Sequence, residues 1–185
     1  MDNGASSYRR FLEGDDDGIV QIIRDYKDGL MLYLNSFVQN IHIAEDLTED
    51  TFVKLIARRP RFSGKSTFKT WLYSIGRNVA LDYLRKNSKL PTVSTEETVA
   101  LLSDEADIAG KYLQTERKLQ VHEAMKGLNK EYRQVLDLIY FEELQNEQVA
   151  FIMGKSKKQI ENLVYRAKLS LKSAMEKEGF VYENL

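Results

Sequence analysis

The sequence contains no cysteine, only two histidines and only two prolines in 185 residues. The absence of cysteine excludes disulfides and the usual thiolate zinc sites, and His42 and His122 lie too far apart to form a metal-binding motif. No apolar run approaches the roughly 20 residues that a helix needs to span a bilayer. The N-terminal segment also lacks the apolar stretch of a signal peptide. We therefore expect a soluble cytoplasmic protein that makes no membrane contact of its own and uses no metal or cofactor.

Acidic residues are almost missing between Lys54 and Lys89, where Asp82 is the single acid. Fixed positive charge holds a phosphate backbone, and flat aromatic faces can stack on unpaired bases. The segment therefore predicts binding to a nucleic acid whose strands separate, although a solvated basic face would have a similar composition. Its ten basic residues and the five aromatic residues among them are Lys54, Arg58, Arg59, Arg61, Lys65, Lys69, Arg77, Arg85, Lys86 and Lys89, with Phe62, Phe68, Trp71, Tyr73 and Tyr83.

Basic residues are in turn scarce between Glu13 and Asp50, where Arg24 and Lys27 stand against ten acids. The net charge of the chain is only −1, from 27 basic and 28 acidic residues, so charge is segregated along the sequence and not in excess. Such segregation suggests two kinds of partner, one of which is a protein. The alternative for the acidic block is a solvated surface.

Apolar residues recur at spacings of three and four through most of the chain, which predicts an all-α fold. Carboxylates favour helix starts, and the residue before a proline avoids the helical region. These signals predict a first domain at residues 8–88 with three helices: one that begins near Asp16 or Asp17, one at about 44–58 that ends before Pro60, and one at about 66–87.

The composition changes at residue 89. Residues 89–115 are rich in acids, Ser and Thr, which predicts a mostly flexible linker with one helical turn at about 99–102. A second all-α domain is expected at 116–177. Within it, Gly154 suits a sharp turn and Ser156 can cap the helix that follows.

The helices on either side of Gly154 have the pattern of a helix-turn-helix, whose second helix lies in the DNA major groove. Six basic residues and one acid lie between Met153 and Lys172, which fits contact with phosphates. An ordinary helix pair within a bundle is the alternative for this segment.

Three segments together resemble bacterial RNA polymerase sigma factors. AEDLTEDTFVKL (44–55) resembles the polymerase-contacting stretch of sigma domain two, and FKTWLYSIGRNVALDYLRK (68–86) resembles its promoter-melting and −10-reading stretch. Residues 124–174 resemble domain four, which reads the −35 element. The chain is similar to the compact extracytoplasmic-function type with only these two domains. The resemblance implies core RNA polymerase and promoter DNA as partners, and an anti-sigma factor as a common regulator.

The resemblance also implies site residues. The loop at 59–67 would hold a flipped base, Asn78 would bond a base edge, and Tyr73 would face a base, whereas Trp71 is expected in the core. The set expected for −10 reading and melting is Arg61, Phe62, Ser63, Lys65, Lys69, Tyr73, Arg77, Asn78, Arg85 and Lys86. The −35 set on the recognition helix is Lys155, Lys157, Lys158, Glu161, Asn162, Tyr165, Arg166 and Lys168. The polymerase-binding set is Glu45, Asp46, Leu47, Asp50 and Phe52, of which Leu47 and Phe52 are more simply explained as core residues.

The chain departs from the family pattern at Asn129, where a proline is frequent, at 148–150 and at Glu161. These departures affect which −35 sequence is read. Two other functions stay open: a helix-turn-helix transcriptional regulator that does not act as a sigma subunit, and a polymerase-binding adaptor. An enzyme is not expected, because adjacent acids such as Glu142 and Glu143 point apart and no nucleophile–base pair or metal cluster is evident.

Overall fold

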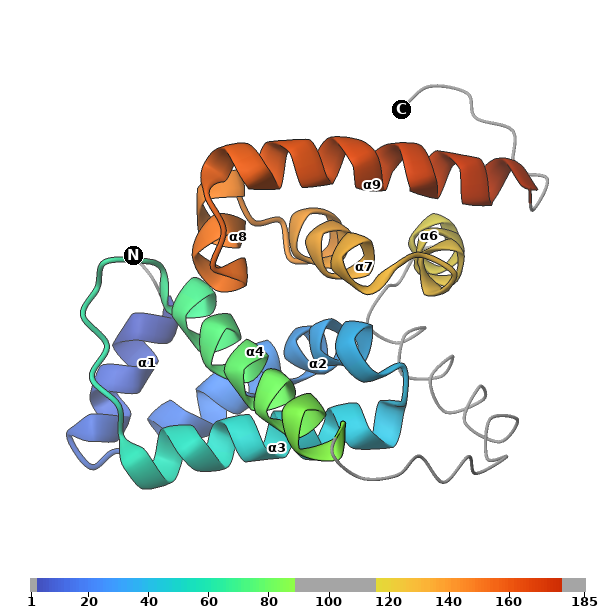
Figure 1. The fold of residues 1–185 in the computed structure, drawn as a ribbon. Coiled ribbons are helices and arrows are strands. Elements are labelled where there is room, and N and C mark those ends of the chain that lie inside the picture. The colour runs from blue at the N-terminus through green and yellow to red at the C-terminus, as the bar shows by residue number, and fades with distance from the viewer. Residues whose placement is uncertain (1–2, 89–115, 178–185) are drawn as a thin grey trace.

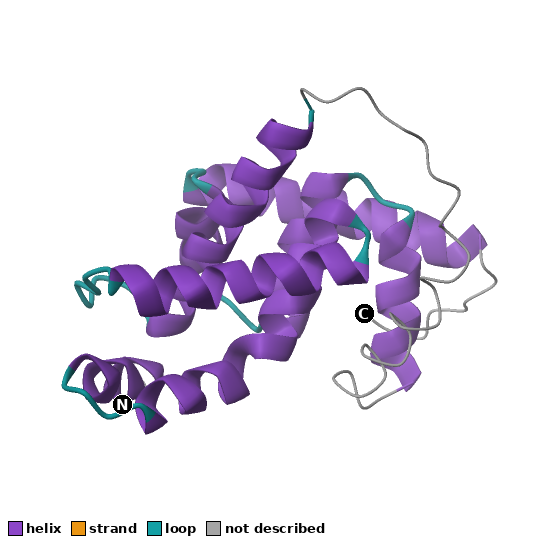
Figure 2. Ribbon diagram, turned by 90° about the horizontal axis from the view of Figure 1, so that it is seen from below, coloured by secondary structure: helices purple, strands orange, loops and turns teal. Residues whose placement is uncertain are grey.

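The computed structural model describes residues 3–88 and 116–177, and within these ranges every regular element is a helix (Figures 1 and 2). This confirms the predicted all-α fold class. The predicted linker at 89–115, with its helical turn at about 99–102, lies outside the described residues. We refer to residues 3–88 as the N-terminal domain and to residues 116–177 as the C-terminal domain.

The N-terminal domain has four helices, with α2 packed against the other three. Side-chain caps set two of its helix starts: Asn40 accepts the Ile43 N–H at 3.1 Å, and Thr67 accepts the Thr70 N–H at 3.2 Å. The cap at Asn40 starts the second predicted helix three residues earlier than the sequence analysis proposed. The helices are α1 (Asn3–Leu12), α2 (Asp17–Val38), α3 (Ile41–Arg58) and α4 (Phe68–Asn87).

Helix α1 is absent from the sequence analysis and extends across the predicted domain start at residue 8. It packs against α2 at a close approach to Gly18, where an added Cβ would lie 2.7 Å from the Phe11 backbone nitrogen and would overlap the Ser7 carbonyl oxygen. The start of α2 also differs from expectation. Asp16 makes no side-chain cap, and the Asp17 N–H is instead accepted by Asp15 Oδ1 at 3.0 Å.

The C-terminal domain contains the predicted helix-turn-helix. Gly154 ends the first of its two helices. Its φ of 64° is in the left-handed region, which glycine adopts without strain. Ser156 and Gln159 then form reciprocal side-chain to backbone bonds that start the second. The elements are α6 (Glu116–Lys126), α7 (Lys130–Leu136), the π-helical turn η1 (Asp137–Phe141), α8 (Asn146–Met153) and α9 (Lys157–Lys177).

The two domains pack directly against each other. Helices α2 and α4 contact α7, η1 and α8, while α3 and α9 lie on opposite outer sides of the molecule (Figure 1). This domain contact places the N-terminal half of α4 between the two domains. It therefore decides which parts of the basic, aromatic segment reach solvent.

Candidate nucleic-acid interface

The loop at 59–67 rests on an aromatic cluster. Phe62 is half-buried, with its ring centroid 5.2 Å from Trp71 and 5.7 Å from Phe68. Tyr8 of α1 packs on Phe68 and Trp71, and its hydroxyl donates to the Pro60 carbonyl at 2.8 Å. Trp71 is half-buried in this cluster and belongs mainly to the packing. The cluster supports the loop while leaving its polar tip exposed, including Arg61, Ser63 and Lys65.

The exposed part of α4 carries three of the predicted −10 residues. Asn78, Arg85 and Lys86 are exposed, and Arg85 forms an ion pair with Asp82 at 2.5 Å. Because this pair is largely solvated, it contributes little and a phosphate can replace the carboxylate. These side chains are available to a ligand in the conformation described.

Three other predicted −10 residues lie on one face of α4, because Lys69, Tyr73 and Arg77 are spaced four residues apart. This face is directed toward the C-terminal domain. Tyr73 is fully buried, which differs from the expectation that it faces a base. Its hydroxyl donates to Glu142 Oε2 at 2.5 Å. Lys69 forms an ion pair with the same carboxylate at 2.8 Å and donates to the Glu142 carbonyl at 2.9 Å.

Two carboxyl groups of the C-terminal domain are buried at this contact. The side chain of Glu142 is 1% exposed, and Asp137 is 2% exposed. Burial raises the pKa of Asp137 well above its ordinary value, and the neighbouring negative charge of Glu142 adds to the rise, whereas Lys69 opposes it. Burial likewise raises the pKa of Tyr33 on α2, with Arg77 opposing and Asp137 adding to the shift. The adjacent Glu143 is exposed with φ of 55°, so the two glutamates do point apart.

The outer side of α9 presents most of the predicted −35 set to solvent. Lys157, Lys158, Asn162, Tyr165, Arg166 and Lys168 are exposed, while Lys155 and Glu161 are half-buried. Three of the lysines form ion pairs at the protein surface: Lys155 with Glu131 at 3.0 Å, Lys157 with Glu147 at 2.5 Å and Lys158 with Glu161 at 3.6 Å. Such pairs are weak in water, so phosphates can compete with these glutamates for the lysines.

The predicted polymerase-binding set divides between the surface and the core of α3. Asp46 and Asp50 are exposed and Glu45 is half-buried. Leu47 and Phe52 are 2% and 5% exposed, so both pack in the core of the N-terminal domain, as the simpler explanation of them expected.

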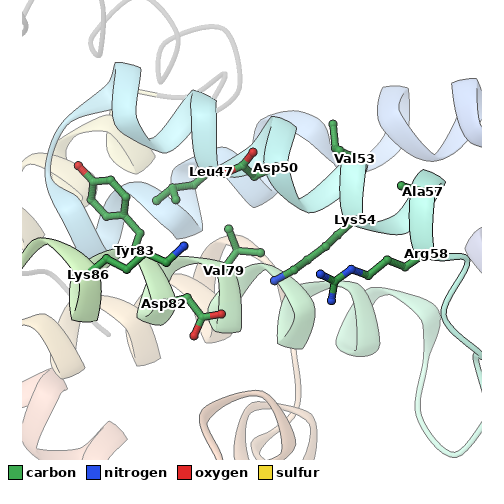
Figure 3. A pocket seen from close by; sticks show the side chains of 10 residues that line it. All are labelled: Leu47, Asp50, Val53, Lys54, Ala57, Arg58, Val79, Asp82, Tyr83 and Lys86. Atoms are coloured by element: carbon green, nitrogen blue, oxygen red, sulfur yellow. The ribbon is translucent and has the colours of Figure 1, made fainter.

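A groove of about 360 Å³ runs between α3 and α4, with Leu47 at its wall (Figure 3). Lys54 and Arg58 extend across it from α3 toward α4. Its lining mixes apolar and charged side chains: Leu47, Asp50, Val53, Lys54, Ala57, Arg58, Val79, Asp82, Tyr83 and Lys86.

Comparisons with known proteins assign both domains. Residues 22–90 match the family model Sigma-70 region 2, and residues 118–171 match Sigma-70, region 4. RNA polymerase sigma factor YlaC of Bacillus subtilis is 30% identical over 162 residues, which cover 87% of this chain and 94% of YlaC. The chain belongs to the ECF RNA polymerase sigma factors. ECF RNA polymerase sigma factor SigM of the same organism is 28% identical over 155 residues, covering 84% of this chain and 93% of SigM.

Solved structures support the fold of this sigma factor. CnrH in complex with the cytosolic domain of CnrY has a TM-score of 0.65 at 19% identity, covering 95% of this chain and 96% of CnrH. RpoE in complex with the anti-sigma factor NepR, from Bartonella quintana, has a TM-score of 0.63 at 22% identity, covering 84% of this chain and 95% of RpoE.

Family membership makes this chain a non-enzymatic transcription factor that binds core RNA polymerase and promoter DNA. Among the described residues, no group of His, Cys, Asp or Glu could hold a metal ion. None of the described helices has the length and apolarity needed to cross a membrane.

Two features of the sigma factor were missed by the sequence analysis. Tyr8 braces the loop at 59–67 from α1, and the only signal for it was the short apolar pair of Tyr8 and Phe11. The contact of Lys69 and Tyr73 with Glu142 was also missed, because those residues lie about 70 positions apart (73 and 69) and follow no shared motif.

Proposed function

We propose that this sigma factor directs core RNA polymerase to promoters with two separate elements, and that each helical domain reads one of them. The observation that carries this division is the match of the two domains to regions 2 and 4, each with an exposed basic helix or loop. Tethering two weak DNA-binding domains to one polymerase raises the effective concentration of the second. We place this activity in the cytoplasm, where bacterial RNA polymerase transcribes.

For the −35 element we assign base reading to α9. Asn162 and Arg166 are exposed one helical turn apart, and amide and guanidinium groups read base edges in the major groove well. Glu161 can accept from a cytosine amine. Lys155, Lys157, Lys158 and Lys168 would hold phosphates and so position the helix without reading sequence.

For the −10 element we assign the loop at 59–67 and the exposed part of α4. Flipping a base costs a few kcal/mol, and a loop already braced by aromatic packing loses less entropy when it receives that base. Asn78 would bond a base edge, while Arg85 and Lys86 would hold the backbone. Lys69, Tyr73 and Arg77 would join this surface when the domain contact is open.

For polymerase we assign the acidic side of α3. Glu45, Asp46 and Asp50 belong to α3, which lies on the outer side of the N-terminal domain, away from the C-terminal domain (Figure 1). Exposed acids suit docking on a basic partner surface. The structurally similar CnrH was solved with the cytosolic domain of CnrY, and RpoE with the anti-sigma factor NepR. Regulation of this chain by an anti-sigma factor stays a prediction.

The test is initiation with purified core RNA polymerase on promoter fragments from the source genome. We expect run-off transcripts from a discrete set that shares two sequence blocks. Asn78→Ala should relax preference in the downstream block and Arg166→Ala in the upstream block, each costing about 1–3 kcal/mol of discrimination. Asn3→Ala and Arg24→Ala, which remove the same side-chain types at exposed positions outside the assigned surfaces, are matched controls.

Two results would contradict the proposal. Polymerase binding without any transcript would favour an adaptor. Tight duplex binding with no polymerase binding would favour a simple helix-turn-helix regulator.

A further inference from the structure

The domain contact is centred on one carboxylate. Glu142 is buried between η1 and α4, where its carboxylate receives both the Lys69 ammonium at 2.8 Å and the Tyr73 hydroxyl at 2.5 Å. Charge-assisted hydrogen bonds of this kind are the strong ones in a protein. Because Lys69 and Tyr73 belong to the N-terminal domain and Glu142 to the C-terminal domain, these bonds exist only while the domains are in contact.

Weaker contacts surround this centre. Arg133 of α7 donates to the Ser36 carbonyl through Nε at 3.3 Å and Nη2 at 3.2 Å. Gln39 Nε2 donates to the Lys126 carbonyl at 2.9 Å, and Gln148 Nε2 donates to Thr67 Oγ1 at 3.3 Å. These bonds lie at the C-terminal end of α2 and at the residue that caps the start of α4, so they fix one orientation of the domains.

The contact covers one functional surface and leaves two others free. It buries Tyr73 completely and Lys69 and Arg77 in part, and these belong to the α4 face assigned above to the −10 element. The −35 residues on α9 and the acids on α3 remain outside the contact. Polymerase can therefore dock on α3 while part of the −10 surface is still covered.

We propose that Glu142 is an intramolecular latch: by binding Lys69 and Tyr73 it holds the free sigma factor in a closed, autoinhibited form that masks part of the −10 surface. In this form the Glu142 carboxylate is paired with the Lys69 ammonium, which would otherwise be available to bind a DNA phosphate. The masking role rests on the proposed function, whereas the closed form itself does not.

The contact is also built so that it can open. Tyr33 Oη, Arg77 Nε and Asp137 Oδ2 are buried there without hydrogen-bond partners among the described residues. Each such atom has lost its hydration without gaining a bond, which opposes closure. The desolvation of Lys69 and Glu142 likewise offsets much of the attraction between the two side chains. A contact with such opposing contributions shifts readily when a partner binds the open form.

Domain closure can be measured directly because the chain has no cysteine. Fluorophores on Glu49→Cys in α3 and Ser173→Cys in α9, both exposed positions, report interdomain energy transfer in the full chain. Lys69→Glu or Glu142→Lys alone should lower transfer, with the closed-to-open ratio falling roughly tenfold. The double variant Lys69→Glu/Glu142→Lys restores an attractive pair and should recover transfer.

Glu143→Lys is the matched control, because it makes the same charge reversal at the adjacent, exposed carboxylate. It should leave transfer unchanged. Circular dichroism on each variant separates opening from unfolding, and the double variant keeps the test decisive if one single variant does not fold. Unchanged transfer in both single variants, or no recovery in the double, overturns the latch.

Masking of the −10 surface is tested by a second measurement. This is the affinity of the free protein for labelled single-stranded oligonucleotides of random sequence. Glu142→Gln should bind them roughly tenfold more tightly than wild type, and Glu143→Gln should match wild type. Opening without tighter binding overturns masking and leaves the closed form. Failure of wild type to initiate transcription with core polymerase would instead contradict the proposed function, and it leaves the energy-transfer result intact.

Discussion

At the scale of single residues, Asp137 opposes the folded state at neutral pH. It is fully buried, one of its oxygens has no partner among the described residues, and its pKa is raised well above 3.8. The charged and titratable groups facing it are Glu142, Lys69, Tyr33 and, beyond Tyr33, Arg77. Because the folded state binds the Asp137 proton more tightly than the unfolded chain, this group makes stability fall as pH rises from about 4 through the higher folded pKa.

We therefore expect Asp137→Asn to raise the melting temperature at neutral pH. The amide keeps the shape and cannot ionise, so the gain should be about 1 kcal/mol near pH 7 and should vanish toward pH 4. Thermal melts across that range measure the difference, with Asp46→Asn as the exposed control. A gain that grows as pH falls would contradict the sign of this linkage.

A second residue-scale prediction concerns Gly18. An alanine Cβ there would overlap the Ser7 carbonyl oxygen and lie 2.7 Å from the Phe11 nitrogen. Both obstacles are backbone atoms, so the modest helix preference for alanine cannot compensate. Gly18→Ala should lower the free energy of unfolding by about 1–3 kcal/mol in chemical denaturation.

Gly127 provides the matched control, because nothing lies within 4 Å of a Cβ added there. Gly127→Ala should leave stability unchanged or slightly raise it. Equal losses in both variants would mean that the α1–α2 approach is not the cause.

At the scale of elements, α1 supports the loop at 59–67, to which we assign contact with the −10 element. Tyr8 holds the loop at 59–67 by its bond to the Pro60 carbonyl and by its contacts with Phe68 and Trp71. Tyr8→Phe keeps the ring and removes only the hydroxyl, at a cost of about 1 kcal/mol. We expect slower promoter opening with unchanged duplex binding at the −35 element, since α9 lies in the other domain.

Permanganate reactivity of unpaired thymines in the holoenzyme–promoter complex measures this opening. Tyr132→Phe, a half-buried tyrosine on α7, controls for the loss of a tyrosine hydroxyl. An equal slowing in both variants would show that the effect does not pass through the loop.

Element positions were predictable where a local signal exists. Helical periodicity and Pro60 set α2–α4, and Gly154 with Ser156 set the turn before α9, because these depend on neighbours in sequence. Asn129 stands where a proline is frequent and caps the start of α7, since its side chain accepts the Tyr132 N–H at 3.0 Å. The ten-residue α1 was missed because it is short and its stability comes from packing on α2.

The burial of Tyr73 could not have been predicted in this way. A tyrosine among lysines and arginines fits both a base-stacking surface and a domain contact, and only the position of Glu142 decides between them in this conformation. Polar contacts between distant segments follow no periodicity. The sequence therefore singled out the basic, aromatic segment without indicating which part of it the domain contact covers.

At the scale of the whole molecule, segregated charge governs how DNA binding responds to salt. With a net charge of −1, the protein attracts DNA only through local surfaces such as α9. Each phosphate contact releases condensed counterions, so log K falls with log salt by about 0.9 per contact. The slope therefore counts the lysines that reach phosphates.

Lys158 and Lys172 allow this count to be tested on one helix. Both lie on α9, and each has a glutamate within one turn, Glu161 at 3.6 Å and Glu176 at 3.9 Å. Lys158 lies at the N-terminal end, beside the turn of the helix-turn-helix, whereas Lys172 lies near the far end. Lys158→Gln should reduce the salt slope of holoenzyme binding to a −35 duplex by about one, and Lys172→Gln should leave it unchanged. Equal reductions would mean that phosphates line the whole of α9, and no reduction in either would place the docking surface on another helix.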